Sequence, residues 1–179
     1  PHHCEICYAP AMTTLHALHF AVLLLSSSPA QAASGGTPDV STAEDHETTG
    51  RVIVAANADI VRAFLADPTR VASVDSGPAQ VEVEDEGSCK LIRTIVTHPL
   101  ASIRYRSRQC PNSIGFRTEL VESTDLTAFH SEWAVRAIQG GTELIYKVRT
   151  IPSIAVPQFL VDRQTRASVT QLLERLKVS

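Results

Sequence analysis

The chain has 179 residues, of which 44% are hydrophobic and 20% are charged, and its formal net charge at pH 7 is −3. This length suffices for one domain with a sizeable core, and the composition excludes a disordered chain and a bundle of membrane spans. So small a charge gives no general attraction to nucleic acid or to anionic membrane. We therefore expect no nucleic-acid partner and only transient membrane contact.

The beginning of the chain carries two segments that we place outside the folded domain. Residues 1–11 contain two histidines and a CxxC pair, but no second ligand pair follows at zinc-site spacing, so we interpret them as upstream, non-native sequence. Residues 12–32 are typical of a secretory signal, because a short apolar run is followed by a break and by Ala-Gln-Ala at 30–32. The alternative is a buried helix or a membrane anchor, but the run is too short to span a bilayer. The sequence therefore predicts a periplasmic or secreted protein.

Residues 33–49 are rich in Ser, Gly, Thr and acidic residues, as is typical of a flexible tether. Organised sequence is expected from residue 50 onward, so that one domain occupies residues 50–179. Its first element is a β-branched strand at residues 51–55.

Two short helices are predicted next. Asn57 is a favourable N-cap, and the apolar residues that follow it share one helical face: Ile60, Val61, Phe64 and Leu65. Asp67 and Pro68 end this helix and begin a second one that runs to residue 74. We interpret Asp75-Ser76-Gly77 as a turn and not as a nucleophile loop, because no matching His and Asp accompany it.

From residue 79 the hydrophobic period changes to two, which indicates strands. Short turns separate the alternating runs, and this favours an antiparallel meander over parallel βαβ units. The expected strands span residues 79–85, 88–97, 101–110, 113–121, 126–137 and 142–150.

The alternation gives this sheet a charged face and a largely apolar face. The apolar face carries Val81, Val83, Ile92, Thr94, Val96, Ile103, Tyr105, Phe116, Thr118, Leu120, Phe129, Trp133, Val135, Leu144, Tyr146 and Val148. Such a face needs an apolar cover, and the amphipathic helix expected at residues 156–178 is long enough to provide one.

The cover helix has an uneven apolar stripe, made of Val161, Thr165, Val169, Leu172, Leu173 and Leu176. Its second half is aliphatic, whereas Gln158, Asp162 and Thr165 place polar groups in its first half. Because polar groups in a dry core need partners, we expect the first half to border a cavity and the second half to seal a core.

These features together resemble a known superfamily. A strand, the phrase ANADIVRAFLAD at residues 56–67, a run of hairpins, Gly140-Gly141-Thr142, two prolines and a long closing helix are similar to the START-like helix-grip superfamily. The superfamily includes polyketide cyclases and coenzyme Q-binding proteins. The resemblance implies an α+β fold in which a curved antiparallel sheet of about seven strands wraps a C-terminal helix. It also implies an apolar cavity for a lipid, sterol, quinone or polyketide, and it carries over no catalytic residue.

Cys89 and Cys110 are predicted to form a cross-strand disulfide. If the hairpin turns on Pro99 and Leu100, these cysteines lie opposite each other, and the same register opposes Thr94 and Tyr105. An exported protein favours the bond over two free thiols. The chain-entropy model gives it about 3 kcal/mol of stabilisation.

A basic stripe on the charged face is formed by Arg93, Arg104, Arg106 and Arg108. It could bind an anionic partner, or it could be a solvated face balanced by Glu82 and Glu84 on the adjacent strand. Cross-strand charge pairing accounts for the arrangement, so we favour the second interpretation.

The sequence predicts binding or transport of a hydrophobic small molecule (lipid, quinone or polyketide-like) in a cavity between the sheet and the last helix. The candidate ligand-binding residues are Thr94, Tyr105, Phe116, Thr118, Trp133, Tyr146, Gln158, Asp162 and Thr165. Core packing is the alternative role for the aromatic ones. The segments 98–100 and 150–156 are expected at the cavity mouth, and no oligomeric state is indicated.

The alternative function is an enzyme of the polyketide cyclase/dehydratase type, and a third is a structural module whose own side chains fill the cavity. The candidate acid/base residues are Asp162 and His130, with Tyr105 as a further option, and an apolar cavity would raise the pKa of Asp162. The alternative that we favour for Asp162 is that it complements the N-terminus of its helix or reaches solvent. None of His46, His98 and His130 has Cys, Asp or Glu at ligand spacing, so neither a metal nor a cofactor is expected.

Overall fold

The computed structural model describes residues 36–74, 79–98 and 101–178. Several predictions fall outside this part of the chain: the upstream segment 1–11, the signal 12–32, the start of the tether, the turn at 75–77 and the hairpin turn at 99–100. No helix in the described part is long and apolar enough to cross a membrane.

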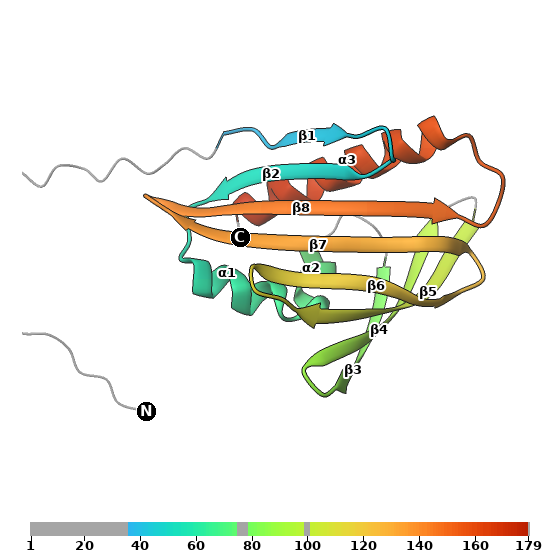
Figure 1. Ribbon diagram of the computed structural model, residues 1–179, viewed down its shortest axis with the longest axis horizontal. Helices are drawn as coiled ribbons and strands as arrows, with labels where there is room; N and C mark the ends of the chain where they lie inside the picture. Colours follow the sequence, from blue (N-terminus) through green and yellow to red (C-terminus); the bar gives the residue numbers. More distant parts are fainter. Residues whose placement is uncertain (1–35, 75–78, 99–100, 179) are drawn as a thin grey trace, which may run out of the picture. The chain divides into compact units, whose positions relative to one another are not determined.

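The described residues form an eight-stranded antiparallel sheet with three helices on one of its faces (Figure 1). The strand order is β1-β2-β8-β7-β6-β5-β4-β3, so the sheet is a meander whose last strand, β8, pairs with β2. The strands are β1 (Asp39–Thr42), β2 (Thr48–Val54), β3 (Ala79–Glu86), β4 (Cys89–His98), β5 (Ala101–Pro111), β6 (Gly115–Ser123), β7 (Leu126–Ile138) and β8 (Gly141–Pro152). The helices are α1 (Ala58–Leu65), α2 (Pro68–Val74) and α3 (Gln158–Val178). The expected α+β helix-grip architecture is therefore confirmed.

The sheet begins earlier than the sequence suggested. Residues 39–42 and 48–49, which we expected in a tether, form β1 and the start of β2, so there are eight strands and not about seven. Thr48 is fully buried and its Oγ1 lies 3.0 Å from Thr42 Oγ1 across the pair. A polar edge hairpin of this kind lacks the hydrophobic alternation by which strands are recognised in a sequence. The antiparallel pairing of β2 with β8 holds it in the sheet instead.

Both short helices begin as predicted. Asn57 Oδ1 accepts a hydrogen bond of 2.8 Å from the backbone N–H of Asp59, and Asp67 Oδ1 accepts one of 3.0 Å from Thr69. Each cap satisfies a backbone donor that the first helical turn leaves without a partner.

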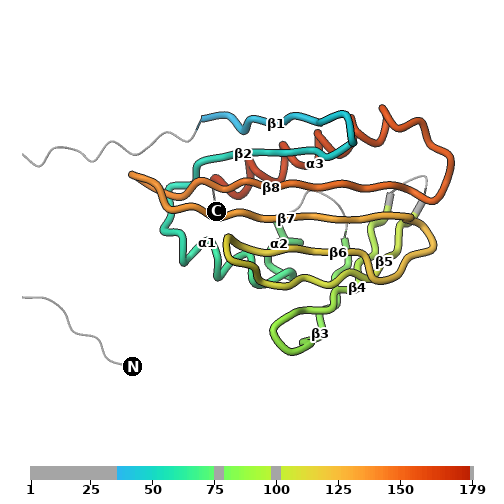
Figure 2. The backbone as a smooth tube through the Cα atoms, in the orientation of Figure 1, coloured from blue at the N-terminus to red at the C-terminus, as the bar shows by residue number. Residues whose placement is uncertain are grey.

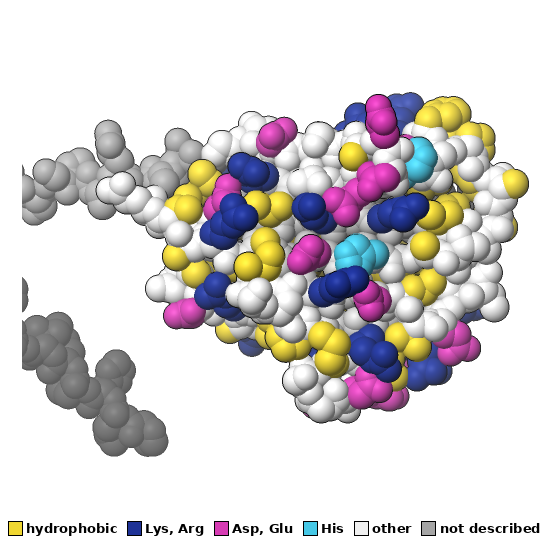
Figure 3. Space-filling view, in the orientation of Figure 1, with side chains coloured by type: hydrophobic (Ala, Val, Ile, Leu, Met, Phe, Trp, Pro, Cys, Tyr) yellow, Lys and Arg dark blue, Asp and Glu magenta, His cyan; other side chains and the backbone are white. Residues whose placement is uncertain are grey.

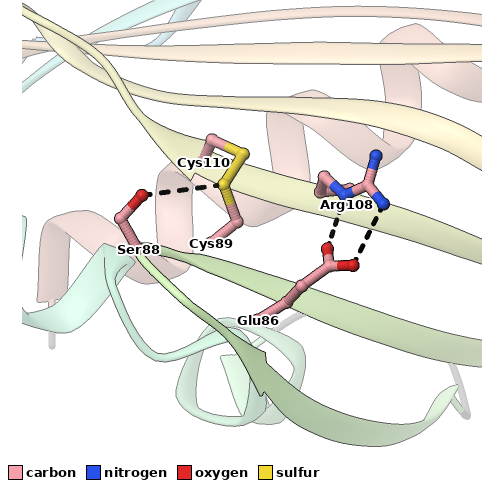
Figure 4. The surroundings of a disulfide bond; sticks show 5 residues. All are labelled: Glu86, Ser88, Cys89, Arg108 and Cys110. Atoms are coloured by element: carbon pink, nitrogen blue, oxygen red, sulfur yellow. Dashed lines mark hydrogen bonds and ion pairs between the residues drawn. A yellow bond between two sulfur atoms is a disulfide. The ribbon is translucent and has the colours of Figure 1, made fainter.

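The hairpin of β4 and β5 has the predicted register, with Thr94 opposite Tyr105, and a disulfide joins Cys89 to Cys110 (Figure 4). On the outer side of this region Arg108 binds Glu86 through two hydrogen bonds of 2.6 and 3.2 Å. The hydrogen bond from Arg108 lowers the pKa of the Glu86 carboxyl. The disulfide and this ion pair therefore tie β5 to β4 and to the end of β3.

The main core lies between α3 and the strands that it crosses. In Figures 1 and 2, α3 runs behind β1, β2 and β8, with α1 and α2 beside it on the same face. Its second half buries Val169, Leu172, Leu173 and Leu176 against β2 and β8, as predicted. Gly50 of β2 makes this contact close, because a Cβ added there would lie 2.6 Å from Leu173 Cδ1.

The opposite face of the sheet is wet and mixed in charge (Figure 3). Three of the four arginines of the basic stripe pair with acidic neighbours: Arg93 with Glu82 at 3.5 Å, Arg106 with Glu122 at 3.2 Å, and Arg108 with Glu86 as described above. The interpretation as a balanced, solvated face therefore fits, although the partners include Glu86 and Glu122 and not the expected Glu84.

Candidate functional site

A hollow of about 140 Å³ lies between α2 and the inner face of β3 to β8. Its lining consists of Pro68, Val71, Ala72, Ala79, Val81, Ile92, Thr94, Val96, Tyr105, Ser107, Gln109, Thr118, Phe129, Ser131, Trp133 and Tyr146. The helix contributes small apolar side chains, whereas the strands contribute aromatic and hydroxyl groups. This volume is close to that of an engineered apolar cavity that admits benzene.

Three polar residues form a row across the floor of the hollow. Gln109 of β5 lies opposite Thr118 of β6, and Thr118 lies opposite Ser131 of β7. Directly opposed residues of neighbouring antiparallel strands have Cβ atoms about 5 Å apart, so the three side chains stand beside one another. All three are at least 92% buried, because their exposed fractions are 8%, 7% and 3%.

Two aromatic pairs flank this polar row. On one side Trp133 stacks on Tyr146 with ring centroids 4.0 Å apart, and on the other Tyr105 contacts Phe129 at 5.0 Å. A flat molecule above the row would therefore meet aromatic rings at both ends.

The buried polar groups of the hollow are only partly used by the protein. Gln109 Nε2 donates a hydrogen bond of 2.9 Å to the carbonyl oxygen of Leu65, the last residue of α1. Within the described chain we find no hydrogen bond made by the side-chain hydroxyls of Thr94, Ser107, Thr118 or Ser131. Every completely buried side-chain nitrogen or oxygen of the described residues does have a partner. These hydroxyls are therefore accessible from the hollow, where a guest could bond to them.

The structure brings five of the predicted ligand-binding residues together at the hollow: Thr94, Tyr105, Thr118, Trp133 and Tyr146. Phe116 does not line it; it is half-buried and pairs with Trp133 at the edge of the core. Sequence reasoning missed Ser107, Gln109, Ser131 and the residues of α2. Strand parity could have found the first two, since Ser107 and Gln109 alternate with the arginines of β5 exactly as Tyr105 does.

The other three predicted ligand-binding residues belong to α3, and no described residue of α3 lines this hollow. Gln158 Nε2 donates to Asp162 Oδ1 at 2.8 Å, and His46 Nδ1 lies 2.9 Å from Asp162 Oδ2. Thr165 is half-buried on the same helix. A ligand-binding role for these three residues stays a prediction. Of the two segments expected at the mouth, 150–156 contributes no described lining residue, and most of 98–100 is outside the described part.

The raised pKa that an acid/base role for Asp162 would need is not found. Burial acts to raise the pKa, but the hydrogen bonds from Gln158 and His46 and the charges of His46 and Arg166 outweigh it. The pKa of Asp162 therefore lies below its ordinary value of 3.8, which suits an ion-pair partner and not a general acid at neutral pH. The second candidate, His130, lies opposite Arg149 and Glu119, two exposed residues, and so on the outer face. Neither candidate reaches the hollow.

The Asp162 carboxylate should make stability depend on acidity. Because its folded pKa is lowered, its contribution is complete above 3.8 and is lost as pH falls through the folded value, where the unfolded chain already binds the proton. We expect Asp162→Asn to lose about 0.5–1 kcal/mol of unfolding free energy at neutral pH and to lose less than the wild type on acidification. Urea unfolding across the acid range measures this, with the exposed Asp39→Asn as control. An acid slope in Asp162→Asn equal to that of the wild type would contradict the assignment.

No protein-family model and no curated protein sequence matches this chain. Solved structures do match. A START superfamily protein from Mycobacterium smegmatis is 14% identical with a TM-score of 0.62, over 74% of this chain and 94% of that one. An aromatase/cyclase from Streptomyces sp. R1128 is 19% identical with a TM-score of 0.60, over 74% and 91%.

The chain has the START-like helix-grip fold. A STAR-related lipid transfer protein from Xanthomonas axonopodis, 14% identical with a TM-score of 0.58, has it as well, over 80% of this chain and 98% of that one. At such identities the likeness concerns the fold alone. A lipid transfer protein and an aromatase/cyclase share this architecture, so the fold by itself does not determine the function.

Proposed function

We propose that this helix-grip domain binds a hydrophobic small molecule in the hollow beneath α2. The observation that carries the proposal is a space bounded by two aromatic pairs and lined by hydroxyl groups that make no hydrogen bond within the described chain. These hydroxyls are open to the hollow, so a guest that bonds to them adds hydrogen bonds to the free energy gained by apolar burial. The likeness to lipid transfer and aromatase/cyclase folds supports a ligand-binding role in general terms.

Binding would be driven by removal of apolar surface from water, at about 25 cal/mol per Å². The aromatic pairs provide most of the contact surface, and the polar row sets the orientation of the guest. Lipid, quinone and polyketide-like ligands remain the classes proposed from the sequence, and the cover over the site is α2 where we had expected α3.

The enzyme alternative has less support from the site. A cyclase or dehydratase needs a group that accepts or donates a proton near the substrate. Among the described lining residues the titratable side chains are Tyr105 and Tyr146, and there is no carboxylate, imidazole or amine. If chemistry occurs here, Tyr105→Phe should abolish it while leaving binding intact.

We also propose that the protein is periplasmic or secreted, and therefore lies outside the cytosol. The disulfide between Cys89 and Cys110 supports this proposal, because such bonds form and persist in oxidising compartments.

Filling the hollow tests the binding proposal. Ala72 lines the hollow from α2, so Ala72→Leu should occupy it and abolish the uptake of toluene, a small apolar probe. The chain has one tryptophan, Trp133, so its indole N–H resonance reports directly on the site. We expect toluene to shift this resonance in the wild type and in the control Ala63→Leu, which changes an exposed residue of α1, but not in Ala72→Leu. A wild-type resonance that toluene leaves in place would refute the proposal.

A further inference from the structure

The lining of the hollow selects for an uncharged guest. Every described residue that lines it is neutral: aliphatic, aromatic, hydroxyl-bearing or amide-bearing. No residue that forms an ion pair within the described chain lines the hollow, although Asp67 and Arg70 pair at the start of α2. A carboxylate or ammonium group placed in the hollow would lose its hydration without meeting an opposite charge.

The volume limits the guest to a single ring. About 140 Å³ is below the range of about 300–1,000 Å³ that is usual for sites of drug-sized ligands, and close to the volume that holds benzene. An extended acyl chain or a fused ring system would project beyond a space of this size. The two aromatic pairs favour a flat ring, since offset and edge contacts between rings add to simple burial.

The hydrogen-bonding pattern points to a hydroxyl on that ring. Gln109 donates one N–H of its side chain to the carbonyl oxygen of Leu65. Its Oε1 is a further acceptor in the row that continues through Thr118 to Ser131. The two hydroxyls both donate and accept. A guest hydroxyl can donate to an acceptor of this row and accept from its neighbour, whereas a purely apolar ring makes no hydrogen bond with the row.

From these three observations we infer that the ligand is a neutral, single-ring phenol, held with its hydroxyl on the row of Gln109, Thr118 and Ser131. This inference rests on the proposed binding function and narrows its ligand class. It separates the site from one built for an acyl lipid or a polycyclic molecule, which would need a larger space and fewer buried polar groups.

Four probes test the inference at neutral pH, with calorimetry and the Trp133 indole resonance as readouts. Phenol is neutral there, benzoate is an anion of similar size, toluene lacks the hydroxyl, and 1-dodecanol is a neutral chain. We expect phenol to bind about tenfold more tightly than toluene, the equivalent of one net hydrogen bond. Benzoate should bind at least about 100-fold more weakly than phenol, and dodecanol should leave the resonance unmoved.

Two variants locate the hydroxyl. Thr118→Val and Ser131→Ala remove the polar groups of the row with little change of shape, and at least one should lower phenol affinity about tenfold, to the level of toluene. In both, the ratio of phenol affinity to toluene affinity should fall, because toluene makes no hydrogen bond with the row. Thr97→Val is the matched control, because Thr97 is exposed on β4, on the face opposite Thr94. The inference is overturned if benzoate or dodecanol binds as tightly as phenol, if phenol gains nothing over toluene, or if both variants keep full phenol affinity. Failure of toluene and phenol alike would remove the proposed function as well.

Discussion

Leu173→Ala is expected to lower the free energy of unfolding by about 2–5 kcal/mol, as buried leucine truncations do when the cavity cannot collapse. Leu173 is completely buried at the centre of the contact between α3 and β2. Urea unfolding of the variant and of Leu160→Ala on the same helix provides the comparison. Leu160 is 44% exposed, so its truncation should cost about 1 kcal/mol or less.

The same contact predicts a coupling with Gly50. A Cβ at this position would lie 2.6 Å from both Leu173 Cδ1 and Val169 Cγ1, so Gly50→Ala alone should destabilise the fold. With Leu173 already truncated, one of the two clashes disappears, and Gly50→Ala should cost less than it does in the wild type. Additive effects, or equal losses from Leu173→Ala and Leu160→Ala, would mean that α3 does not grip the sheet through Leu173.

Opening the disulfide is expected to have the second large effect. Cys89 and Cys110 are 21 positions apart in the sequence. For a loop of this size the chain-entropy model gives about 3 kcal/mol of stabilisation. The double variant Cys89→Ser/Cys110→Ser should therefore unfold at lower urea concentration by this amount. Its register should be kept, because the β4 and β5 pairing runs from Lys90 to His98 without the bond.

The control for this experiment is reduction of the wild type. Reductant should bring the wild type to the stability of the double variant and should leave the double variant unchanged. A loss below about 1 kcal/mol would indicate that the unfolded hairpin already stays closed without the bond, since the stabilisation acts mainly through the unfolded chain.

Much of the candidate site followed from parity along the strands. Tyr105, Thr118, Trp133 and Tyr146 were assigned to the inner face because side chains alternate with a period of two, and the structure places them at the hollow. Ser107, Gln109 and Ser131 share that face and line the hollow as well, although they were not among the predicted ligand-binding residues. Polar residues on a buried face are the informative exceptions to hydrophobic patterning.

The sequence alone determined whatever depends on neighbours along the chain. Helix caps at Asn57 and Asp67 use backbone groups two residues away, and strand parity uses alternate residues. The register of β4 and β5 was predicted from the position of Pro99 and Leu100 between them. Such signals are local, so they can be read without coordinates.

Only the tertiary structure decided where the domain begins, what binds Asp162 and which helix covers the hollow. His46 and Asp162 are 116 residues apart in the sequence. His46 lies in the turn between β1 and β2, and these strands lack the apolar alternation by which a strand is recognised in a sequence. The hollow lies beneath α2 because the inner sheet face is wider than the aliphatic half of α3, so that a second helix shares in covering it. These features arise from contacts between segments that are far apart in the sequence. Such contacts stabilise the protein only once the whole sheet has closed around its helices.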